Sequence, residues 1–122
     1  MWFSVDFHSH VPVYIQIKEN IKGMILKGKL KVGDYIPSIR ALAKDLGVNV
    51  NTVARAYREL EQEGIIHAER GEGYVVKKSV EDEIKIETLE ELRRIVKKLK
   101  SMGIQKEHIQ SILDNEFSNG SN

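Results

Sequence analysis

The side chains best suited to chemistry lie in one short stretch, "GVNVNTVARAYRELEQEG", at residues 47–64. Asn49, Asn51 and Thr52 occur at its start, and Arg55 follows one turn later. Amide and guanidinium groups suit the edges of adenine and guanine in the major groove of DNA. The N–H groups at a helix N-terminus also attract phosphate. The stretch therefore predicts a helix whose first turns contact DNA.

The apolar residues of this stretch divide the helix into two faces. They recur at i, i+3, i+4 and i+7, which is the spacing of a buried face: Val53, Ala56, Tyr57 and Leu60. Asn51, Arg55 and Arg58 then lie on the opposite face, together with Gln62. The alternative is that Asn and Thr are ordinary helix caps and that the arginines belong to a solvated surface. The short turn "GVN" before the helix favours DNA contact, since helix-turn-helix geometry requires such a turn.

Two further basic positions extend this candidate surface. Ser38, in "PSIR", is predicted to cap a helix and is also placed to contact phosphate, while Arg40 points away from the apolar side. In "ERGEG", Arg70 precedes Gly71 and Gly73 at a narrow tip that could enter a minor groove. Taken singly, each feature is more often an ordinary exposed arginine or a plain hairpin turn.

A regular order of elements positions these side chains. Pro12 is predicted at the first position of a helix that ends near Gly28, and a second helix is predicted between Ser38 and Gly47. The helix at 49–64 follows, and then two short strands, "IIHAER" and "YVVKK", flank "GEG". This order predicts an α+β fold with an N-terminal winged helix-turn-helix.

The composition changes after "EDE" at 81–83. Thr88 and Glu91 are predicted to form a capping box, and Gly103 is predicted to end the helix that they start. An apolar stripe along this helix is expected to pair two copies of the chain: Leu89, Leu92, Ile95, Val96, Leu99 and Met102. The alternative is that the stripe packs onto its own domain. The expected organisation is a lead-in at 1–11, a winged helix-turn-helix at 12–78, a two-helix dimerisation segment at 79–117 and a disordered tail at 118–122.

Composition narrows the function classes. The 122 residues carry a net charge of +1, but residues 11–78 hold twelve Lys and Arg against eight Asp and Glu. The absence of cysteine excludes disulfides and thiolate metal sites. No catalytic triad, carboxylate pair or phosphate loop emerges, so we expect no enzyme activity, no cofactor and no metal. No apolar stretch approaches the roughly 20 residues of a membrane span, which predicts a soluble, cytoplasmic protein.

Three motifs in the right order carry a family resemblance. "GDYIPSIRALA", "GVNVNTVARAYRELEQEG" and "RGEGYVV" make residues 10–77 resemble the DNA-binding domain of GntR-family bacterial transcription regulators. The short C-terminal part is similar to the YtrA subfamily, whose small tail dimerises. Ala54 stands where many relatives carry a second base-reading arginine. The resemblance implies DNA contacts at the matched positions, which are Arg40, Asn49, Asn51, Thr52, Arg70 and Gly71.

The expected function is that of a dimeric, sequence-specific transcription repressor. Each protomer would place the 49–64 helix in a major groove and the hairpin in a minor groove of an inverted-repeat operator. The resemblance also implies control of a transporter operon, while the sequence identifies no effector. The alternative is a winged-helix protein-interaction module without specific DNA readout.

Overall fold

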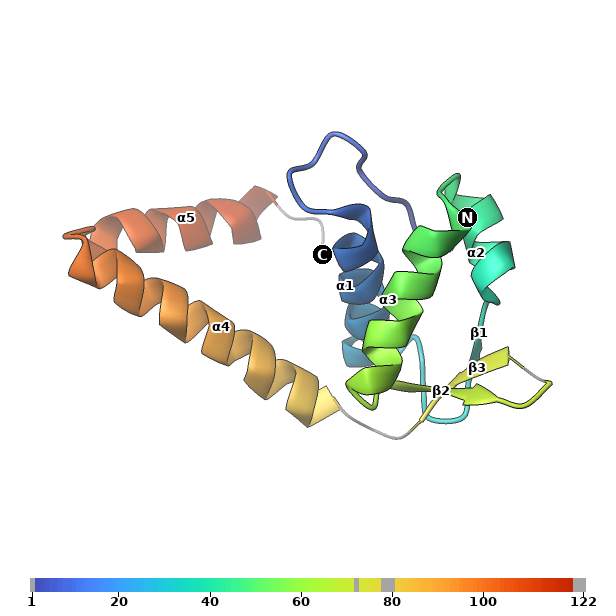
Figure 1. The fold of residues 1–122 in the computed structure, drawn as a ribbon. Coiled ribbons are helices and arrows are strands. Elements are labelled where there is room, and N and C mark those ends of the chain that lie inside the picture. The colour runs from blue at the N-terminus through green and yellow to red at the C-terminus, as the bar shows by residue number, and fades with distance from the viewer. Residues whose placement is uncertain (1, 72, 78–80, 120–122) are drawn as a thin grey trace. The chain divides into compact units, whose positions relative to one another are not determined.

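The computed structural model describes residues 2–71, 73–77 and 81–119, with the backbone alone at 81–83. The chain divides into two compact units, Met1–Ile84 and Lys85–Asn122. Among the described residues, no helix has the length and apolar character needed to cross a membrane. The elements follow one another as labelled in Figure 1: α1 (Val13–Leu26), β1 (Tyr35–Ile36), α2 (Ile39–Leu46), α3 (Val50–Gln62), β2 (Ile66–Glu69), β3 (Gly73–Val76), α4 (Glu81–Ser101) and α5 (Lys106–Asn119).

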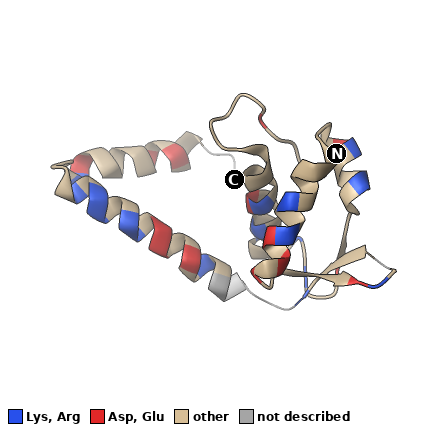
Figure 2. Ribbon diagram, in the orientation of Figure 1, with Lys and Arg blue, Asp and Glu red and all other residues tan. Residues whose placement is uncertain are grey.

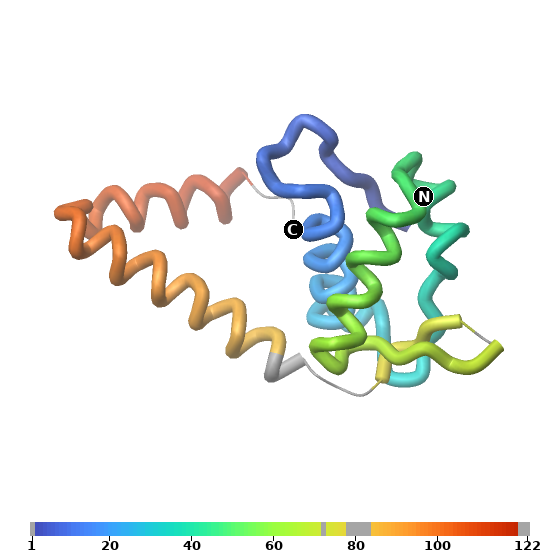
Figure 3. The backbone as a smooth tube through the Cα atoms, in the orientation of Figure 1, coloured from blue at the N-terminus to red at the C-terminus, as the bar shows by residue number. Residues whose placement is uncertain are grey.

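The first unit is built around α3. This helix packs against α1, α2 and β2, and Figures 1 and 3 show α1 running beside it. The residues predicted to face the core do so, because Val53, Ala56, Tyr57 and Leu60 are all completely buried. The matching face of α1 consists of Ile17, Ile21 and Ile25, and that of α2 consists of Leu42, Ala43 and Leu46.

Local hydrogen bonds fix the helix-turn-helix. The Ser38 hydroxyl accepts a bond from the Ala41 amide at 3.1 Å and so caps α2, as predicted. Gly47 ends α2 with φ of 70°, a left-handed conformation that costs glycine little. Asn49 caps α3 in turn, because its Oδ1 accepts a bond from the Asn51 amide at 2.7 Å. Three residues, 47–49, therefore connect α2 to α3, in agreement with the predicted turn.

A three-stranded antiparallel sheet forms the wing. β3 lies in the middle, paired with β2 in the predicted hairpin and with β1 on its other side. β1 consists of Tyr35 and Ile36 alone, and two residues are too few to show the alternation from which a strand is predicted. The Tyr57 hydroxyl donates a bond to the Pro37 carbonyl at 2.6 Å, and its ring meets that of Tyr74 edge-on at 5.0 Å. These contacts join α3 to the sheet.

The second unit consists of α5 and all of α4 except its first residues. Gly103, with φ of 84°, separates the two helices as predicted. The capping box predicted at Thr88 is wrong, because α4 begins at Glu81 and Thr88 lies inside it. Residues 84–87 contain no Gly or Pro, and Ile84 is buried in the core of the first unit, so the helix is already formed before Thr88. Ser118 and Asn119, placed by sequence in the tail, close α5, while residues 120–122 lie outside the described residues.

Candidate nucleic-acid interface

The exposed face of α3 carries the polar side chains singled out in the sequence. Asn51, Arg55 and Arg58 are exposed, and Thr52 is partly buried. Asn49 is exposed at the N-terminal end of the same helix, where its side chain acts as the cap. A cap role and a phosphate contact are compatible, because the Asn49 amide nitrogen remains a donor while the oxygen accepts. The structure thus brings Asn49, Asn51, Thr52 and Arg55 together in the first turns of α3, and Arg58 follows further along the same face.

Arg55 is held against α1. Its Nη2 donates a bond to the Tyr14 hydroxyl at 3.0 Å, and its Nε donates to Oε2 of Glu59 at 3.3 Å. Its Cζ lies 3.8 Å from the centre of the Tyr14 ring, a cation–π distance. The Arg55 side chain is 52% exposed, so it is restrained without being buried. Sequence reasoning missed this contact because Tyr14 is 41 residues away.

An ion-pair network extends the α1–α3 contact toward the end of α3. Lys18 Nζ lies 2.9 Å from Glu59 Oε1 and 2.6 Å from Glu63 Oε2, and Lys22 Nζ lies 2.7 Å from Glu63 Oε1. Burial opposes the charge on Lys18, but its bonds to the two glutamates outweigh this effect and raise the Lys18 pKa. The bond from Lys18 lowers the pKa of Glu59. Burial opposes the charge on Glu63, yet the two lysines still lower its pKa.

Basic side chains also occur on α2 and at the wing. Ser38 and Arg40 are both exposed at the start of α2, and the Ser38 hydroxyl can still donate its hydrogen while it accepts as a cap. Arg70 and Gly71 are exposed at the tip of the hairpin, where Gly71 has φ of 75° and Gly73 has φ of 96°. Figure 2 shows Lys and Arg on α1, α2 and α3 and at this tip. The first unit therefore presents the predicted candidates on three of its elements.

The apolar stripe predicted for dimerisation lies on α4, apart from Met102, which directly follows the last residue of that helix. Leu89, Leu92, Ile95 and Met102 are exposed by 46–64%, while Val96 and Leu99 are partly buried. A groove of about 410 Å³ is lined by part of the stripe together with Arg93 and Lys97. Because large apolar side chains on this helix face solvent, the stripe offers a surface that a second chain can cover. Dimerisation itself stays a prediction.

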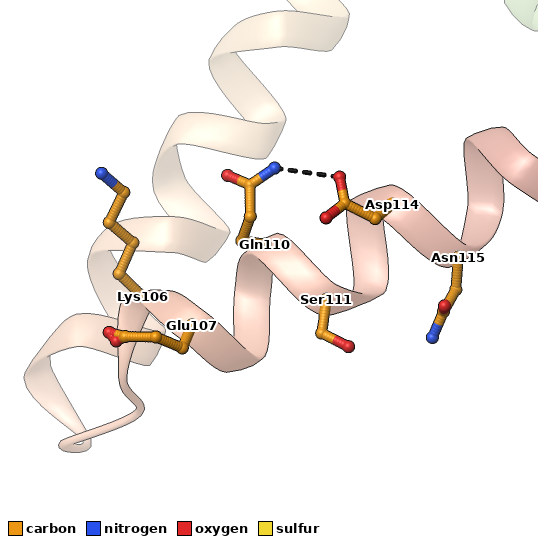
Figure 4. A pocket seen from close by; sticks show the side chains of 6 residues that line it. All are labelled: Lys106, Glu107, Gln110, Ser111, Asp114 and Asn115. Carbon is orange, nitrogen blue, oxygen red and sulfur yellow. Dashed lines mark hydrogen bonds between the residues drawn. The ribbon is translucent and has the colours of Figure 1, made fainter.

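A separate hollow of about 600 Å³ lies along α5 (Figure 4). In it, Gln110 donates a bond to Asp114 at 3.1 Å. All the lining residues come from this one helix, so no second element encloses a ligand there. They are Lys106, Glu107, Gln110, Ser111, Asp114 and Asn115.

Comparison with known proteins identifies the winged unit. Residues 13–76 match the description "Bacterial regulatory proteins, gntR family", a span that runs from the first residue of α1 to the last residue of β3. The chain belongs to the GntR family. The resemblance drawn from the three motifs is thereby confirmed.

Two relatives of this GntR-family chain come from Bacillus subtilis (strain 168). YhcF, described as an uncharacterized HTH-type transcriptional regulator, is 38% identical over 107 residues, which cover 85% of this chain and 88% of YhcF. The HTH-type transcriptional repressor YtrA is 49% identical over 69 residues, which cover 57% of this chain and 53% of YtrA. The first match extends well beyond the winged unit, whereas the second covers about half of each chain.

Solved structures show the same fold. A protein from Listeria monocytogenes EGD-e, described as a transcriptional antiterminator, matches with a TM-score of 0.75 and 34% identity over 95% of this chain and 89% of that one. YtrA from Sulfolobus acidocaldarius, a GntR-family transcription factor, has a TM-score of 0.58 and 41% identity over 73% of this chain and 95% of its own. The DNA-binding domain of AraR in complex with operator ORX1 matches at 0.55, with 28% identity, over 61% of this chain and 94% of that domain. These matches agree with the predicted winged helix-turn-helix.

Proposed function

We propose that this GntR-family chain is a dimeric transcription repressor that binds an inverted-repeat DNA operator. The observation that carries the proposal is the first part of α3, where exposed Asn51 and Arg55 follow a three-residue turn and a capped helix end, with Arg58 exposed further along the helix. This is the arrangement by which a recognition helix enters the major groove. The match to the AraR domain bound to its operator supports the same placement.

The other candidates fit this mode of binding. In the proposed complex, Ser38, Asn49 and Thr52 contact phosphate, and the helix dipoles of α2 and α3 reinforce these contacts. Arg40 reaches a base edge or the adjacent backbone. Arg70, with Gly71 and Gly73, enters the neighbouring minor groove.

Dimerisation sets the operator geometry in this proposal. We assign residues 12–78 to DNA binding and residues 79–117 to the dimer, which forms through the apolar stripe on α4. A two-fold dimer presents two copies of α3, so the operator contains two half-sites related by inversion. The repressor role is supported by the identity shared with YtrA of Bacillus subtilis, and control of a transporter operon rests on the family resemblance alone.

The test begins with selection of bound sequences from random double-stranded DNA by the full chain. We expect an inverted repeat, and a gel-shift titration on it should show tighter binding than on scrambled DNA at physiological salt. The affinity should fall steeply as salt rises, because Lys and Arg contacts release counterions from DNA. Equal binding to both DNAs would overturn the proposal. A salt-insensitive affinity for a protein partner would point instead to a protein-interaction module.

A further inference from the structure

The base-reading end of α3 has an apolar side that the predicted DNA contacts do not use. Val50, the first residue of the helix, is 45% exposed. Ala54 lies one turn further on at i+4, on the same side, and is partly exposed. Asn51 is exposed beside them. The groove end of the helix therefore presents an aliphatic surface next to an amide.

Packing does not explain Val50. The apolar position that stabilises a helix start is the residue before the cap, and here Val48 occupies it, partly buried against the core. Val50 is absent from that core and from the apolar residues packed against it. An exposed β-branched residue also gives a helix start no advantage over alanine. Its exposure thus leaves it free for a partner.

Arg55, the arginine in the first turns of α3, is directed toward α1. The hydrogen bonds of Arg55 to Tyr14 and Glu59, and its stacking on the Tyr14 ring, draw the guanidinium to the side of α3 that packs on α1. In a helix, residues 50 and 54 lie about 100–140° from residue 55. The two aliphatic side chains therefore lie with Asn51 at the start of α3, away from the Arg55 guanidinium, and Arg58 follows one turn beyond Ala54.

We infer that Val50 and Ala54 read the C5-methyl group of a thymine in each operator half-site, beside an adenine read by Asn51. The inference rests on the proposed DNA-binding function. The methyl group is the one apolar feature of the major groove, and aliphatic side chains recognise it by contact. Asparagine pairs with the N6 and N7 edge of adenine. A valine offers guanine no hydrogen-bond donor, so the half-site is selected for A·T pairs under this part of α3.

Deoxyuridine provides a direct test, because it differs from thymine only by the missing methyl group. The operator selected from random DNA by the full chain is remade with each half-site thymine replaced in turn by deoxyuridine. At one position, this replacement should lower the affinity of the chain for the operator about fourfold per half-site, the equivalent of ~0.8 kcal/mol for one buried carbon. The Val50→Ala variant should bind the thymine operator more weakly and lose most of this discrimination.

Val32→Ala is the matched control, since Val32 is another exposed valine of the same unit, at 51%. This variant should discriminate between the thymine operator and the deoxyuridine-substituted operator as the wild type does. Circular dichroism melting curves check that both variants fold. The inference is overturned if no thymine shows a methyl effect, or if Val50→Ala keeps the full effect. Either result leaves DNA binding intact, whereas a selection that recovers no preferred sequence removes the proposed function as well.

Discussion

The guanidinium of Arg55 stacks on the ring of Tyr14 and also donates to its hydroxyl, so one side chain of α1 contacts α3 in two ways. Tyr14→Phe removes the hydroxyl and keeps the ring, and should lower the free energy of unfolding by about 0.5–1 kcal/mol. Tyr14→Ala also removes the ring, which packs against the core, and should cost at least about 0.5–1 kcal/mol more, the value of an exposed cation–π contact alone. Urea denaturation measures both changes.

A double-mutant cycle with Arg55→Ala isolates this contact. If the pair interacts as described, Tyr14→Phe should cost less in the Arg55→Ala background than in the wild type. Strictly additive effects would contradict a direct bond between the two side chains.

The ion-pair network predicts a loss of stability in acid. The pKa values of Glu59 and Glu63 are lowered from 4.5 on folding, so both carboxylates stabilise the folded state above that pH. Their contribution disappears as the pH falls through the lower, folded pKa values. The free energy of unfolding should therefore decline below about pH 4.5, and it should decline less in Lys18→Met.

Lys29→Met is the control for this experiment, because Lys29 is exposed and belongs to none of these ion pairs. It should keep the acid dependence of the wild type. The raised pKa of Lys18 affects stability at alkaline pH. The protonated lysine stabilises the folded state below pH 10.5, and this stabilisation is lost as the pH rises through the folded pKa. An unchanged acid profile in Lys18→Met would refute the network.

Removal of the buried Tyr57 hydroxyl should lower the stability of the fold substantially. Tyr57→Phe leaves the Pro37 carbonyl without its 2.6 Å donor and should cost about 1–3 kcal/mol of unfolding free energy. The ring remains to fill the core and to meet Tyr74. A shift in the thermal midpoint measures the effect, and an unaltered midpoint would show that water replaces the hydroxyl.

Arg40 and Arg70 should differ in what they contribute to DNA binding. If Arg40 reads a base, Arg40→Ala should cost about 1–3 kcal/mol on the selected operator and relax specificity at one position. If Arg70 contacts only the backbone in the minor groove, Arg70→Ala should weaken binding to all sequences and reduce the salt slope by about one. Gel-shift titrations over several salt concentrations separate the two. Lys27→Ala, at an exposed lysine after α1, should change neither quantity.

A substitution in the apolar stripe on α4 should prevent dimerisation without unfolding the chain. Leu92→Glu places a charge among exposed apolar residues and should convert a dimer into a monomer in sedimentation velocity experiments. Operator affinity should fall with it, since two linked half-site contacts become single ones. Arg94→Glu reverses a charge on the opposite face of the helix and should remain dimeric. A monomeric wild type would disprove the dimer.

Local signals in the sequence predicted most of the first unit. Spacing alone assigned Val53 and Tyr57 to the core, and residue type alone placed the cap at Ser38. These features depend on neighbours within four residues. They are therefore readable without a structure.

Features that depend on distant partners could not be predicted. β1 exists because its two residues pair with β3, about 40 residues away, and Arg55 is fixed by a tyrosine equally distant. At Thr88 a valid capping signal was overridden, because burial of Ile84 starts α4 earlier. The candidate site residues were thus chosen from residue types, whereas the contact that restrains Arg55 is visible only in the structure.

The position of α3 at the centre of the first unit has a consequence for hydrogen exchange. The helix is in contact with α1, α2 and β2 at once, and its buried face is completely covered. Its central amides can exchange with solvent only when these neighbours separate, so they report global unfolding. Arg70 and Gly71 of the hairpin are exposed, so their amides should open by local fluctuations at far lower cost. The same small unit should thus combine slowly exchanging amides in the middle of α3 with rapidly exchanging amides at Arg70 and Gly71.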